Sequence, residues 1–193
     1  MIRIPQVTLV CLTGKDRPGH EKAIEKSTKL ISFGAVKLLW DESIASIDEW
    51  NRKVIQELPG YIETSHALLI HADGYVINPF MWDNAWLEYD YIGAPWPLPQ
   101  DKYSYRDEAG DLVRVGNSVS LRSKKLMALV KTREWRSYYG NTNEDGFICC
   151  HNRKWLESQG CRFAPLDVAK YFSKEHELEE NRDIKTFAFH KVD

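Results

Sequence analysis

The chain has 193 residues, of which 43% are hydrophobic and 28% charged, and its formal net charge is −2. This composition is typical of one globular domain with a sizeable core and excludes a disordered chain. The charge gives no general reason to expect a nucleic acid or an anionic membrane as partner, and no apolar run approaches the ~20 residues of a membrane span. Residues 1–6 lack the apolar stretch of a signal peptide. We therefore expect a single domain over residues 1–193, in the cytoplasm, and leave open whether it is part of a longer protein.

The first half of the chain alternates predicted strands and helices. Strands are expected at residues 7–12, 35–40 and 66–70, and helices at 20–31 and 46–58. Gly34 is expected to end the first helix. Ser46 followed by Glu49 predicts the start of the second helix, and Pro59-Gly60 its end.

This alternation predicts an α/β fold with a mostly parallel central sheet and helices on both faces. Ligands of such sheets bind at the carboxyl ends of the strands. Three polar segments follow the predicted strands directly: Thr13-Gly14-Lys15, Asp41 and His71-Ala72-Asp73. We expect the functional site beside them.

The second half is less regular. A short strand at 90–96 is expected to enter a proline-rich loop, and Gly116-Asn117-Ser118 to form a glycine loop before a helix at 123–131. Thr142-Asn143-Glu144-Asp145 is expected to cap a helix that carries Phe147, Ile148 and Trp155. Further expectations are a strand at 162–164, a helix at 166–172, a charged surface segment at 175–183 and an apolar run at 186–190 that ends in His190.

Four features of this pattern suggest chemistry, and three of them have a purely structural alternative. Asp73 at a strand end suits a hard divalent cation, although Asp73-Gly74 also reads as a turn. Glu144-Asp145 suits a general base or simply a favourable helix start. Gly116 permits close approach of a ligand, and His190 is either a ligand or a surface residue. The chain contains no P-loop, no G-x-G-x-x-G after the first strand and no G-x-S-x-G motif.

The four free cysteines do not form a recognisable metal motif. They are Cys11, Cys149, Cys150 and Cys161, and no two have C-x-x-C spacing. Adjacent cysteines followed by His151 do not match the spacing of a structural zinc site. We expect buried thiols.

In their order along the chain, the four features resemble the common core of GT-A glycosyltransferases. Residues 67–73 resemble the apolar strand and Asp-x-Asp motif of that family, with His71 in place of the first aspartate and Asp73 as the second. Gly116-Asn117-Ser118 resembles the glycine loop at the donor, Asn143-Glu144-Asp145 the x-Glu-Asp motif, and His190 the C-terminal histidine of the metal site. Longer phrases, such as 73–79, 91–96 and 162–165, resemble small GT-A-like domains from bacterial and algal-virus glycan gene sets, over nearly the whole chain.

This resemblance implies a hexosyltransferase-type enzyme that moves a sugar from a nucleotide diphosphate donor, with a UDP-sugar as first candidate, to a glycan hydroxyl. It implies Asp73 and His190 as ligands of Mn²⁺ or Mg²⁺. It implies Asp145 as the base of an inverting reaction, with Glu144 as its supporting catalytic residue. The donor site would comprise Thr13, Gly14, Lys15, Asp41, Ala72, Asp73, Gly116 and Asn117.

Two alternatives remain open from the sequence. A sugar nucleotidyltransferase would need a glycine-rich basic loop after the first strand, where this chain has only Gly14, Lys15 and Arg17. A catalytically dead glycan-binding domain is favoured slightly by His71 and by the aromatic-rich loops.

Overall fold

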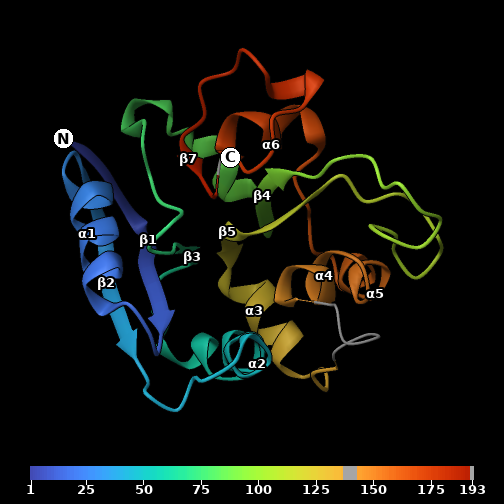
Figure 1. Ribbon diagram of the computed structural model, residues 1–193, viewed down its shortest axis with the longest axis horizontal. Helices are drawn as coiled ribbons and strands as arrows, with labels where there is room; N and C mark the ends of the chain where they lie inside the picture. Colours follow the sequence, from blue (N-terminus) through green and yellow to red (C-terminus); the bar gives the residue numbers. More distant parts are fainter. Residues whose placement is uncertain (137–142, 192–193) are drawn as a thin grey trace.

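Five strands form one mixed sheet in the computed structural model, which describes residues 1–136 and 143–191 (Figure 1). The strands lie in the order β2-β1-β3-β5-β4. Their bounds are β1 Ile2–Thr13, β2 Ile31–Trp40, β3 His66–Leu69, β4 Tyr91–Pro95 and β5 Val115–Ser123. β1 is parallel to β2 and β3, whereas β5 is antiparallel to β3 and β4. All strands except β5 thus point the same way, which confirms the predicted α/β class and mostly parallel sheet.

Helices cover both faces of this sheet, as predicted. The helices are α1 Arg17–Thr28, α2 Ile47–Gln56, α3 Lys124–Lys131, α4 Glu144–Cys149, α5 Arg153–Ser158 and α6 Leu166–Phe172. Shorter 3-10 turns lie at Leu58–Tyr61, Pro79–Met81, Asn84–Glu88 and Glu179–Asn181. Within the described ranges, no helix is both long and apolar enough to cross a bilayer.

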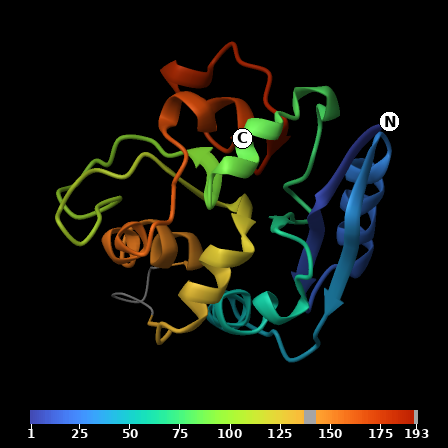
Figure 2. The same cartoon turned by 180° about the vertical axis from the view of Figure 1, so that it is seen from behind.

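The alternation of side chains along β1 explains how the two helix layers are held. One core cluster joins β1 to α1 and α6 through Val7, Leu9, Ala23 and Phe172. The other joins the opposite face of β1 to α2 and α3 through Val10, Leu12, Trp50 and Met127. Successive strand residues point to opposite faces, so one apolar strand supplies both cores. Figure 2 shows the helices and strands of this arrangement from behind.

Local signals placed α2 correctly but misplaced the end of α1. Ser46 caps α2, and its Oγ accepts the backbone N–H of Glu49 at 3.2 Å, while Glu49 reaches back to the Ser46 N–H. α1 ends at Thr28, and the predicted stop signal, Gly34, lies inside β2. A Cβ at Gly34 would stand 2.1 Å from the Pro5 carbonyl oxygen, so the crowding between β1 and β2 requires the glycine there.

Three predictions for the second half need correction. The expected glycine loop at 116–118 lies within β5. The helix expected after the cap at 142–145 is divided into α4 and α5, and Trp155 lies on α5; residue 142 of that cap lies outside the described residues. Residues 162–164 do not form a strand of the sheet; Phe163 makes a single bridge with Tyr91.

A small parallel pair, β6 Ser173–Lys174 and β7 Ala188–Phe189, brings distant segments to one place. β7 and the residues after it also lie along residues 73–75. Phe189 N–H donates to the Tyr75 carbonyl at 3.2 Å, and Lys191 N–H donates to the Asp73 carbonyl at 3.1 Å. Residues near the C-terminus are thereby fixed beside the segment that follows β3.

Candidate functional site

A cavity of about 310 Å³ collects polar side chains from five separate segments of the chain. Its lining is Ile47 and Trp50 of α2, His71 and Asp73 after β3, Ser118 of β5, Asn143, Glu144 and Asp145 at the start of α4, and Glu175, His190 and Lys191. The predicted metal residues Asp73 and His190 and the predicted base Asp145 therefore share one cavity. So does Ser118, the last residue of the predicted glycine loop.

Asp145 is a partly buried carboxylate held by two backbone amides. Its Oδ2 accepts the N–H of Asn117 at 3.1 Å, and its Oδ1 accepts the N–H of Gly146 at 2.8 Å. Burial, reinforced by the neighbouring Glu144 charge, raises the pKa of Asp145 to about 7. A carboxylate with this pKa suits general-base catalysis near neutral pH.

Glu144 has a different environment from Asp145. Its Oε1 lies 2.6 Å from Nη2 of Arg122, and both side chains are almost completely buried. Nε of Arg122 also donates to Ser120 Oγ at 2.8 Å. The ion pair between Arg122 and Glu144 occupies the Glu144 carboxylate and fixes the start of α4 against β5. The supporting catalytic role expected for Glu144 stays a prediction, and the structure gives this carboxylate a structural role at the start of α4.

Asp73 and His190 face each other across the cavity. Asp73 Oδ1 lies 3.7 Å from His190 Nε2, and Asp73 Oδ2 lies 3.8 Å from the Lys191 ammonium. His71 sits beside them, with its ring centroid 5.2 Å from those of His190 and Trp50. Burial is the main cause that holds the pKa of His71 well below its usual value, so the ring is neutral. Its Nε2 is buried without a hydrogen-bond partner.

These residues fit a divalent cation only as a partial ligand set. Among residues 1–136 and 143–191, no three His, Cys, Asp or Glu side chains are grouped so that they could hold a metal. Asp73 and His190 offer one oxygen and one nitrogen. Mg²⁺ commonly takes one or two protein carboxylates and completes its shell from substrate phosphates and water, so Asp73 is the better match of the two. The unpartnered Nε2 of His71 indicates that a polar group is accommodated here.

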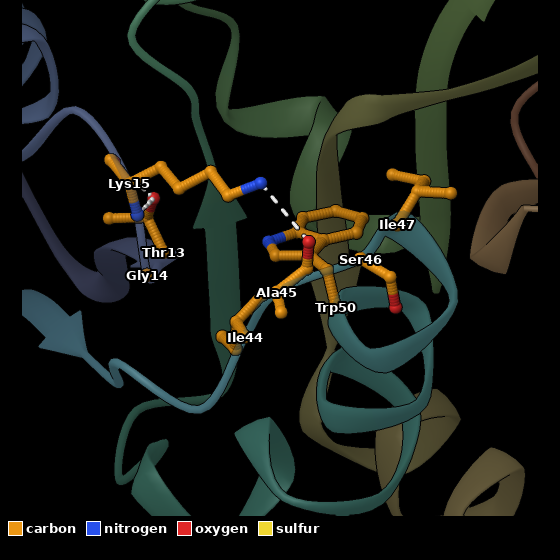
Figure 3. Close-up of a pocket in the computed structure, with 8 residues that line it drawn as sticks. All are labelled: Thr13, Gly14, Lys15, Ile44, Ala45, Ser46, Ile47 and Trp50. Atoms are coloured by element: carbon orange, nitrogen blue, oxygen red, sulfur yellow. Dashed lines mark hydrogen bonds between the residues drawn. The ribbon is translucent and has the colours of Figure 1, made fainter.

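A second cavity of about 200 Å³ adjoins the first through Ile47 and Trp50, which line both (Figure 3). It lies between Thr13-Gly14-Lys15, at the end of β1, and residues 44–47. Nζ of Lys15 donates to the Ala45 carbonyl at 3.1 Å and so links the two walls. Gly14 allows them to approach, because a Cβ there would stand 2.5 Å from the Asp41 carbonyl oxygen. Three of the predicted donor residues thus form one wall of a pocket.

Other predicted donor residues have structural environments of their own. Asp41 pairs with Lys53, whose hydrogen bond is the main cause that lowers the pKa of Asp41 to about 2. Gly116 packs against Trp96, whose ring a Cβ would meet at 1.8 Å. Asn117 is buried, and its backbone N–H holds Asp145. None of these three, nor Ala72, lines either cavity.

Sequence reasoning missed several residues that line the main cavity. Ile47 and Trp50 lie on the predicted helix 46–58, where their positions do not distinguish a cavity wall from core. Glu175 begins a segment predicted to be charged surface, yet its side chain is only 21% exposed. Lys191 follows His190 directly. None has a sequence signal of its own, because only the tertiary arrangement brings them to Asp145.

Comparisons with known proteins give one matching family model and a likeness of fold to solved structures. A family model described as "Protein of unknown function (DUF5672)" matches residues 36–190. The structure resembles a glycosyltransferase involved in the glycosylation of the major capsid of PBCV-1, with a TM-score of 0.61 and 11% identity over 96% of this chain and 92% of that chain. A197 from STIV matches with a TM-score of 0.41 and 11% identity over 84% of this chain and 80% of that chain, too low to support an argument. A search of curated proteins found no match.

Proposed function

The chain belongs to the family described as "Protein of unknown function (DUF5672)", and from its cavity and its glycosyltransferase-like fold we propose that it is a glycosyltransferase. Its donor is a nucleotide diphosphate sugar, with UDP as first candidate, and its acceptor is a glycan hydroxyl. The observation that carries this proposal is the convergence of Asp145, Asp73 and His190 on one cavity that adjoins the pocket after β1.

The two cavities suit the two parts of such a donor. The nucleoside would occupy the pocket beside Thr13-Gly14-Lys15, and the sugar diphosphate would extend past Trp50 into the main cavity. The indole ring of Trp50, which lines both cavities, is held in place because its Nε1 donates to the Leu12 carbonyl at 2.7 Å. A bound Mn²⁺ or Mg²⁺, held by Asp73 and His190, would neutralise the diphosphate.

Asp145 would accept the proton of the acceptor hydroxyl while that oxygen attacks the anomeric carbon of the sugar. The bond from this carbon to the diphosphate oxygen breaks as the new bond forms, and the configuration inverts. A carboxylate with a pKa near 7, raised mainly by burial, is ionised in a large fraction of molecules at neutral pH and still basic enough to help.

The direct test is turnover of a panel of nucleotide sugars with Mn²⁺, detected by release of the nucleoside diphosphate, preceded by a thermal-shift screen of the nucleotides. A ligand that binds the native state raises the melting temperature. Release that depends on a hydroxyl acceptor supports the proposal. Tight glycan binding without turnover of any donor would identify a binding domain instead, and pyrophosphate release from a nucleoside triphosphate would identify a nucleotidyltransferase.

We predict that Mn²⁺ strengthens UDP binding to the native chain by about tenfold or more, equivalent to about 1.4 kcal/mol, and that Asp73→Ala abolishes this gain. The carboxylate of Asp73 faces the cavity 3.7 Å from His190 Nε2, so its loss removes half of the proposed protein ligands. Calorimetric titration of UDP in Mn²⁺ and in EDTA measures the effect. Asp83→Ala changes an exposed aspartate outside the cavity and should keep the full gain. Equal affinities in Mn²⁺ and EDTA for the unmodified chain would refute the metal requirement.

The raised pKa of Asp145, caused mainly by burial, also predicts the pH dependence of the transfer rate. The ionised form is the base, so kcat/KM should rise with pH and level off above about 7. Below that midpoint it should fall about tenfold per pH unit, since a single proton blocks the base. Initial rates between pH 5 and 9 measure this profile. A midpoint near 4, the ordinary value for an aspartate, would contradict the assignment of Asp145.

A further inference from the structure

Glu175 and His190 are held side by side by the β6–β7 pair. Lys174 is the register partner of Phe189 in this parallel pair, so the next residue of each strand leaves from the same end. The His190 N–H donates to the Lys174 carbonyl at 2.9 Å, which continues the pairing by one step. Both side chains line the main cavity. The fold therefore places a carboxylate directly behind the histidine that faces Asp73.

The two side chains are in close contact and have little access to solvent. Glu175 Oε1 lies 3.2 Å from His190 Nδ1, and the two side chains are 21% and 11% exposed. The Nδ1 atom is buried and makes no hydrogen bond of good geometry. A buried ring nitrogen requires a partner, and a small rotation of the imidazole would align it with the Glu175 oxygen already within reach. The other nitrogen, Nε2, faces Asp73.

We propose that Glu175 is a positioning residue whose carboxylate accepts a hydrogen bond from Nδ1–H of His190 and so leaves Nε2 bare beside Asp73. Which ring nitrogen of a histidine carries the proton is set by the hydrogen bond that the other nitrogen makes. A carboxylate behind a metal-binding histidine fixes the orientation of its ring and makes the free nitrogen a better ligand. The benefit for a cation rests on the proposed function, whereas the position of the proton does not.

The position of the proton is measured by two-bond ¹H–¹⁵N NMR of the histidine rings in the metal-free protein, with His190→Gln to assign the signals. We expect the Nδ1–H form in the native chain and its loss in Glu175→Ala. Titration with Mn²⁺ alone, followed by electron paramagnetic resonance, should show an affinity about tenfold to a hundredfold weaker in Glu175→Ala. Glu177→Ala is the matched control, since this glutamate belongs to the same segment but is 59% exposed, and it should change neither result.

A native His190 protonated on Nε2 would overturn the proposal, as would unchanged NMR signals and Mn²⁺ affinity in Glu175→Ala. If Glu175→Ala does not fold, Glu175→Gln replaces it. The amide is a weaker acceptor, so the Nδ1–H resonance should shift and Mn²⁺ affinity should fall a few-fold, and no change in either would again overturn the role. If Glu175→Ala loses the Nδ1–H form of His190 and the native chain transfers no sugar, the role of Glu175 is upheld. Only the proposed function is then rejected.

Discussion

Asp145→Asn is expected to lower the rate of sugar transfer by about two to four orders of magnitude, the usual contribution of a general base. The amide keeps the shape of the side chain and an oxygen that accepts the N–H of Asn117, but it has no basicity. Affinity for UDP should stay nearly the same, because the pocket proposed for the nucleoside and the proposed cation ligands, Asp73 and His190, are other residues. Transfer rates at saturating donor, together with calorimetric affinities for UDP, separate the two effects.

Protein stability gives an independent check of the same variant. Burial raises the pKa of Asp145 in the folded state, so the folded protein retains a proton that the unfolded chain releases near pH 4. Folding of the native chain is therefore penalised increasingly between about pH 4 and 7, and Asp145→Asn avoids this penalty. The variant should melt at a higher temperature than the native chain at pH 8 and at nearly the same temperature at pH 4.

Asp167→Asn is the matched control, because this side chain is 91% exposed and lies on α6 outside both cavities. It should preserve the transfer rate and the pH dependence of melting. Near-normal transfer by Asp145→Asn would eliminate Asp145 as the base, and retention of the donor's anomeric configuration would eliminate the inverting reaction. Either result leaves the glycosyltransferase proposal itself standing.

The elements that the sequence predicted well depend on local interactions. Ser46 and Glu49 form their capping box within four residues, so their pattern determines where α2 begins. Gly34 was misread because the same residue can end a helix or relieve crowding between strands. The short distance between a Cβ placed on Gly34 and the Pro5 carbonyl oxygen identifies the second role. This contact arises from the pairing of β1 with β2, which the local sequence does not reveal.

The candidate site was predictable only in part, for a related reason. The family pattern identified Asp73, Asp145 and His190, which line one cavity although they lie far apart in the sequence. The pattern could not show that Gly116 accommodates Trp96, because the packing of β4 on β5 creates that contact. Glu175 was missed since a charged stretch usually indicates an exposed face. Its burial arises from the pairing of two strands of two residues each, which are too short to show a period.

The buried pair of Arg122 and Glu144 should matter strongly for the stability of the fold. Arg122→Met leaves the Glu144 carboxylate buried without its partner, so we expect a loss of about 3–5 kcal/mol in the free energy of unfolding, measured by urea denaturation at pH 7. The double variant Arg122→Met, Glu144→Leu removes both charges and should recover much of this loss. Arg17→Met is the matched control, since its pair with Glu21 is more than half exposed, and it should cost at most about 1 kcal/mol. A loss below about 1 kcal/mol for Arg122→Met would mean that Glu144 is not a buried, unpartnered charge in this variant. The Glu144 charge would then no longer explain part of the raised pKa of Asp145.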